Sequence, residues 1–170
     1  MSDPIYIMFL QLARDTAVNM MNNALYIQKE LPGIDVPDDL RSKIEEVCKS
    51  LINTKHDVLH ELFGYSREQG ESTTFGERIL YDLSEPVGEM HPLVMELQSL
   101  SEKDKRYSLA FILIAESSIN ILTVFQQAEA AFSVWRDKES NTENAGDNKW
   151  KQLHKKEMTR NNVLTENNFV

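Results

Sequence analysis

The most apolar stretch of this chain, residues 107–125 (YSLAFILIAESSINILTVF), carries a carboxylate, Glu116, near its middle. At about 1.5 Å per residue, a helix of this length would just cross a hydrocarbon layer of roughly 30 Å. A carboxylate near the centre of such a span costs roughly 2.5–3.5 kcal/mol, and the helical pattern continues past Phe125 without a polar stop. We therefore expect the central helix of a soluble bundle rather than a membrane span.

The polar residues of this segment are ordered by helical spacing. They recur at intervals of four, three and four, which places them in one stripe along a helix: Glu116, Asn120, Thr123 and Gln127. Large apolar side chains occupy most of the remaining circumference. This pattern predicts a helix buried on three sides, with its polar stripe facing water or a polar partner, so Asn120, Thr123 and Gln127 are candidate interface residues.

The N-terminal segment predicts a second long helix. Asp3 followed by Pro4 is a favourable helix start, and Pro32 with Gly33 is a typical end. Apolar residues between these points recur at alternating spacings of four and three: Tyr6, Leu10, Ala13, Ala17, Met20, Ala24 and Ile27. Small residues at the centre of this seam would let another helix approach closely, so Ala13, Ala17, Met20 and Ala24 are also interface candidates.

A third long helix is predicted from Pro37 to Gly64. Its apolar face carries Leu40, Ile44, Val47, Leu51, Val58 and Leu62. The short connection PGIDVP between this helix and the first one favours an antiparallel hairpin.

The remaining body has a less regular pattern. Residues 64–74 predict a loop, and a short helix is expected from Phe75 until Pro86, Gly88 and Pro92 interrupt it. Ser101 with Asp104 resembles a cap for a last helix over residues 102–137. The expected fold is therefore an all-α antiparallel bundle of about four main helices, with a domain over 1–137. Residues 138–170 form a flexible polar tail, with a possible short helix near 147–158.

Charge and composition restrict the function classes. The net charge is −9, and residues 1–137 hold 12 basic and 22 acidic side chains. This acidic body disfavours direct binding of nucleic acid or anionic lipid. The single cysteine, Cys48, lies beside an apolar stripe, and the N-terminus lacks a secretory signal, so we expect a cytoplasmic protein.

Two groups of residues are candidate sites. His56 and His60 are one helical turn apart, which would let two imidazoles share a metal, but no third ligand is identifiable and surface histidines are the favoured interpretation. Glu116 could be a buried acid or base, a metal ligand, or an ion-pair partner of Arg14 or Arg78. We favour the simpler interpretation, in which Glu116 lies at the solvent edge of its helix.

An acidic stretch also occurs in residues 77–89, and its members are Glu77, Asp82, Glu85 and Glu89. Bundles that bind metals through carboxylates use Glu-x-x-His pairs, and none occurs in the helices predicted here. We therefore expect a solvated charged face and no cofactor.

Two functions follow as hypotheses. The favoured one is a non-enzymatic helical protein-interaction module that self-associates, for example as a homodimer, and whose acidic body binds a protein partner. The alternative is a metal- or carboxylate-dependent enzyme with a site in the bundle core around Glu116.

Overall fold

The computed structural model describes residues 3–65 and 70–143, and the described part is helical apart from its connections. Its α-helices are α1 (Pro4–Glu30), α2 (Asp38–Gly64), α3 (Thr73–Lys103) and α4 (Ser108–Glu143), with short 3₁₀ turns at Leu31–Gly33 and Lys105–Tyr107. The predicted all-α class with four main helices is confirmed.

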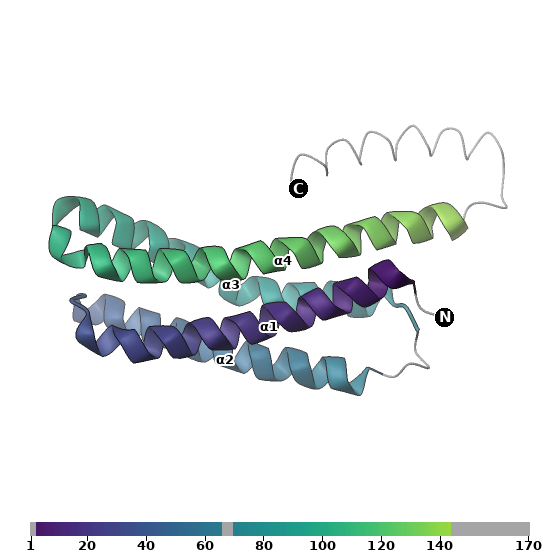
Figure 1. The fold of residues 1–170 in the computed structure, drawn as a ribbon, viewed down its shortest axis with the longest axis horizontal. Coiled ribbons are helices and arrows are strands. Elements are labelled where there is room, and N and C mark those ends of the chain that lie inside the picture. Colours follow the sequence, from purple (N-terminus) through teal and green to yellow (C-terminus); the bar gives the residue numbers. More distant parts are fainter. Residues whose placement is uncertain (1–2, 66–69, 144–170) are drawn as a thin grey trace.

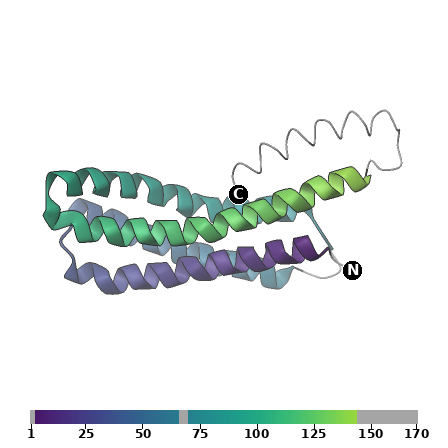
Figure 2. The same cartoon turned by 45° about the horizontal axis from the view of Figure 1, so that its top comes forward.

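The four helices run alternately in opposite directions and form an elongated antiparallel bundle (Figure 1, Figure 2). Each helix packs against two neighbours: α1 lies between α2 and α4, and α3 also lies between α2 and α4. The α1–α4 contact is the most extensive and the α2–α3 contact the least extensive of these four. The end of α4 therefore lies beside the start of α1.

Local signals in the sequence position the first two helices correctly. Asp3 caps α1 by accepting a hydrogen bond from the Ile5 amide at 2.7 Å, and Pro4 occupies the first helical position. Pro37 immediately precedes α2, whose last residue is Gly64. Both helices therefore begin and end where Pro, Asp and Gly predict.

The third helix is longer than the sequence suggested. The expected interruption at Pro86, Gly88 and Pro92 is wrong, because α3 continues through all three. A proline inside a helix loses one hydrogen bond and costs about 3 kcal/mol. Here the buried seam continues across both prolines at spacings of three and four, and its packing outweighs that cost. Its members are Gly76, Ile79, Leu83, Pro86, Met90, Leu93 and Leu97.

The start and end of the fourth helix also differ from prediction. Ser101 belongs to α3 and donates its hydroxyl to the Gln98 carbonyl, while Asp104 accepts from the Arg106 amide and begins the 3₁₀ turn. The helix then starts at Ser108 and continues to Glu143, so residues 138–143 are part of this helix. The predicted helix near 147–158 lies outside the described residues.

The small-residue seam of α1 faces the core of the bundle. Ala13, Ala17, Met20 and Ala24 are all fully buried. Their small size lets neighbouring helices of the same chain approach closely. The prediction that they form a surface for another molecule is therefore wrong, because the bundle itself covers them.

The outer side of α4 is less buried than predicted. Leu109, Ile112 and Ile119 are exposed by 64%, 45% and 62%, so the helix is not covered on three sides. The segment Lys105–Asn141 is long and apolar enough to cross a membrane. Of its most apolar stretch of 18 residues, 33% is buried in the bundle. The core helix of a soluble protein can have the same length and composition, so these properties give only weak support for a membrane span.

Candidate functional site

Glu116 lies on the exposed side of α4, together with Asn120, Thr123 and Gln127. The predicted stripe is therefore the solvent edge of the helix. Buried residues in the described part include only two polar ones, Thr16 and Ser117. A core site built around Glu116 is thus absent from the described residues, because the carboxylate is on the outside.

His56 and His60 are both exposed on α2. Their one-turn spacing is preserved, but neither belongs to a group of three or more potential metal ligands among the described residues. The geometry supports the interpretation of two surface histidines.

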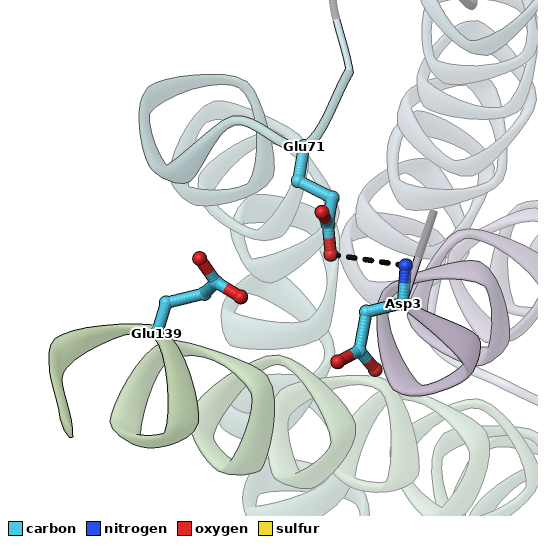
Figure 3. Close-up of side chains that lie close together, drawn as sticks. All are labelled: Asp3, Glu71 and Glu139. Atoms are coloured by element: carbon cyan, nitrogen blue, oxygen red, sulfur yellow. Dashed lines mark hydrogen bonds between the residues drawn. The ribbon is translucent and has the colours of Figure 1, made fainter. Parts of the chain in front are cut away.

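The described residues do contain one group of three carboxylates, at the end of the bundle shared by both termini of the described chain (Figure 3). Asp3 precedes α1, Glu71 precedes α3, and Glu139 lies near the end of α4. One oxygen from each lies within 4.8 Å of the other two. This spacing would suit a cation, although exposed acidic groups are common without one.

Protein donors already use much of this group. Glu71 Oε1 accepts from the Asp3 amide at 3.2 Å and from Trp135 Nε1 at 2.8 Å. Lys138 Nζ donates to Asp3 Oδ2 at 2.6 Å, and this bond, followed by the one from Ile5, lowers the pKa of Asp3. Through Asp3 and Glu71, these contacts join the starts of α1 and α3 to the end of α4, and we call them the structural clasp.

Aromatic side chains pack directly beneath the clasp. The rings of Tyr6 and Trp135 have centroids 4.7 Å apart, and those of Phe9 and Phe132 are 4.9 Å apart. The Tyr6 hydroxyl also donates to the Ser72 carbonyl at 3.3 Å. The sequence identified Asp3 through its capping role but not its partners, because Glu71 and Glu139 carry no local signal.

A second acidic group lies where α2 meets α3. Arg78 Nε is 3.6 Å from Glu61 Oε2, a buried oxygen that accepts no hydrogen bond from the described residues. Burial raises the pKa of Glu61 and of Asp82, and Arg78 offsets this only in part. Further acids, among them Asp57, raise both pKa values as well. Negative charge is therefore crowded at this end of the α2–α3 contact.

The other acids along α3 differ in whether they form an ion pair with a described residue. Glu77 pairs with Arg136 and Glu96 pairs with Lys43. Asp82, Glu85 and Glu89 form no ion pair with another described residue. We call Asp57, Glu61, Asp82, Glu85 and Glu89 the acidic α2–α3 surface.

Exposed apolar side chains are concentrated elsewhere. Eight of the eleven large hydrophobic side chains exposed in the described part belong to α1 or α4. They are Ile7, Met8, Leu25 and Tyr26 of α1, and Leu109, Ile112, Ile119 and Val134 of α4. These two helices lie side by side in front of α2 and α3 (Figure 1), and we call their exposed sides the α1–α4 face.

The single thiol is inaccessible. Cys48 is buried in α2, and burial raises its pKa to about 11. A buried thiol that stays protonated is a poor nucleophile, so Cys48 is a core residue.

No protein-family model, curated protein or solved structure matches this chain. Function is therefore inferred from the chemistry of the surfaces described above.

Proposed function

We propose that this protein is a non-enzymatic helical interaction module that self-associates and binds a basic protein partner. The observation that carries the proposal is the division of its surface: the acidic α2–α3 surface is on one side, and apolar side chains are exposed on the α1–α4 face. Two chemically different surfaces on one small bundle suit two different contacts.

Uncompensated charge supports the choice of a basic partner. Asp82, Glu85 and Glu89 lack an ion pair within the described part of the chain, and the raised pKa of Glu61 and Asp82 reflects burial and neighbouring acids. A Lys- or Arg-rich segment of another protein would relieve this repulsion. The acidic body thus favours cationic partners.

The surface chemistry does not support the alternative function, an enzyme with a core site around Glu116. Glu116 is exposed, and the buried residues in the described part include no carboxylate. A cytoplasmic location belongs to the proposal as well, and the buried free thiol of Cys48 is consistent with it.

A labelled oligolysine peptide tests the acidic surface. Its affinity for the full chain would be measured by fluorescence anisotropy at low salt, for the native protein and for Glu85→Gln combined with Glu89→Gln. We expect this variant to bind about two- to thirtyfold more weakly, because each of the two lost charges contributes about 0.2–1 kcal/mol at an exposed site.

The matched control is Asp15→Asn combined with Glu116→Gln, which removes the same number of charges from exposed positions of α1 and α4. It should retain most of the affinity. An equal loss in both variants would show that only net charge matters, and absence of binding at low salt would contradict the proposed partner.

A further inference from the structure

The part of the α1–α4 face formed by residues 4–28 and 108–128 carries little charge, whereas the end around Val134 also holds the exposed Glu129, Arg136 and Lys138. Between Pro4 and Gln28 in α1 and between Ser108 and Ala128 in α4, the charged residues are Arg14, Asp15 and Glu116. Two acidic bodies repel each other over most of their surfaces. They can approach with the least repulsion through this face.

The dimensions of the face suit a specific interface. Its shorter helix, α1, has 27 residues, which corresponds to a length of about 40 Å. Two adjacent helices present a width of roughly 20 Å, so the face covers about 800 Å². A stable interface of standard size buries about 800 Å² per partner.

Apolar and polar side chains are mixed on this face. Ile112 and Ile119 are exposed beside Asn120, Thr123 and Gln127. Interfaces between proteins that also exist separately have a similar mixture of apolar and polar area. The four-three spacing of the polar residues keeps them on one side of α4.

We propose that the occupant of the α1–α4 face is the same face of a second copy of this chain. The contact is isologous, so each copy contributes the same residues of α1 and α4. This inference rests on the self-association in the proposed function and adds the surface that mediates it. It is independent of the acidic surface on the other side of the bundle.

The first test compares two exposed hydrophobic residues, one on α4 within the α1–α4 face and one on α3 outside it. Ile119 of α4 is 62% exposed and Tyr81 of α3 is 64% exposed, so a glutamate at either position has similar access to water in the monomer. Sedimentation equilibrium of the full chain should show a dimer that Ile119→Glu weakens at least tenfold. Tyr81→Glu should leave the dissociation constant unchanged.

A second test measures protection of an engineered thiol. Ile119→Cys and Tyr81→Cys would be labelled with a maleimide over a range of protein concentrations. Because Cys48 is buried and its pKa is about 11, it contributes little background. The thiol at position 119 should react more slowly as concentration rises, whereas the thiol at position 81 should react at a constant rate.

Every other outcome contradicts the proposal, and each one identifies a different alternative. A monomer at all concentrations removes self-association as a whole, and a dimer insensitive to Ile119→Glu retains self-association but rejects this face. Protection of position 119 that does not depend on concentration assigns the face to residues 144–170 of the same chain. A monomer whose position 119 is protected only by phosphatidylcholine vesicles assigns it to lipid.

Discussion

At the residue scale, Gly76 shows how closely α3 approaches α4. A Cβ atom at this position would lie 2.8 Å from Phe132 Cδ2 and 2.9 Å from Cζ, and closer still to Cε2. Phe132 is buried and packs against Phe9, so its ring has little room to move. Glycine is therefore required here by close approach rather than by its backbone conformation.

Gly76→Ala should lower the free energy of unfolding by about 1–3 kcal/mol through overpacking. Gly88→Ala is the matched control in the same helix, because its Cβ would meet nothing within 4 Å. The control should gain about 0.5–1 kcal/mol from the better helix propensity of alanine. Urea unfolding of both variants measures the difference, and a gain in both would contradict the close contact.

Glu61 gives a prediction about pH. Its folded-state pKa is raised, first by burial, and that of Asp82 is raised for the same main reason. A raised pKa means that folding favours the protonated carboxyl, so the ionised form lowers stability at neutral pH. This penalty disappears as the pH falls below the ordinary glutamate value of about 4.3.

Glu61→Gln should therefore slightly stabilise the protein at pH 7, because the Arg78 ion pair that it loses is mostly exposed and contributes no more than about 1 kcal/mol. The difference from the native chain should vanish near pH 4 and below. Thermal unfolding across this range measures it, with exposed Glu116→Gln as a control. A variant less stable than the native protein at pH 7 would show that the Arg78 pair dominates.

At the element scale, α3 shows how tertiary packing overrides a local signal. Pro86 and Pro92 both lie inside the helix, but Pro86 is buried in the seam and Pro92 is exposed. The seam of three-four spacing through Leu83, Met90 and Leu97 was readable in the sequence. The two prolines nevertheless predict an interruption, because the local cost of proline inside a helix is large.

Replacing the exposed Pro92 should show how much a proline inside α3 destabilises the fold. Pro92→Ala restores an amide that can bond to the Gly88 carbonyl, and loses almost no buried contact, so it should stabilise the fold by about 1–3 kcal/mol. Pro86→Ala should gain less, because it also removes buried atoms. Comparison of their denaturant midpoints checks this order, and equal gains would argue against a packing role for Pro86.

At the scale of the whole molecule, helix order determines where charge lies. The described parts of α2 and α3 carry most of the acids without ion pairs, while α1 and the first half of α4 are nearly uncharged. Because α1 and α4 are neighbours, their exposed sides form one face. The two proposed contacts therefore use opposite sides of the bundle.

Oligolysine binding and dimerisation should respond differently to salt, as measured by fluorescence anisotropy and by sedimentation equilibrium. Raising NaCl to about 0.5 M shortens the screening length to roughly 4 Å and should abolish most oligolysine binding. The dimer should be unchanged or tighter, because salt screens the repulsion between acidic bodies and does not weaken apolar contacts. Loss of both at high salt would indicate that the dimer is electrostatic.

Much of the fold was predictable because its signals are local. Asp3 with Pro4, Pro37 and Gly64 determined where α1 begins and where α2 begins and ends, and repeated three-four spacing identified the buried sides of both helices. The candidate site residues were less predictable. Asp3, Glu71 and Glu139 meet only through the fold, since they are far apart in the chain.

By itself, the sequence determined that the chain forms amphipathic helices, because helical periodicity and capping depend on residues a few positions apart. Only the tertiary structure decided which of the many apolar residues of α1 and α4 would be covered. Each helix has room to bury one side against its two neighbours, so the alanine seam of α1 became core while Ile112 and Ile119 of α4 were left outside. The same choice placed Glu116 in water, although its sequence neighbours are apolar.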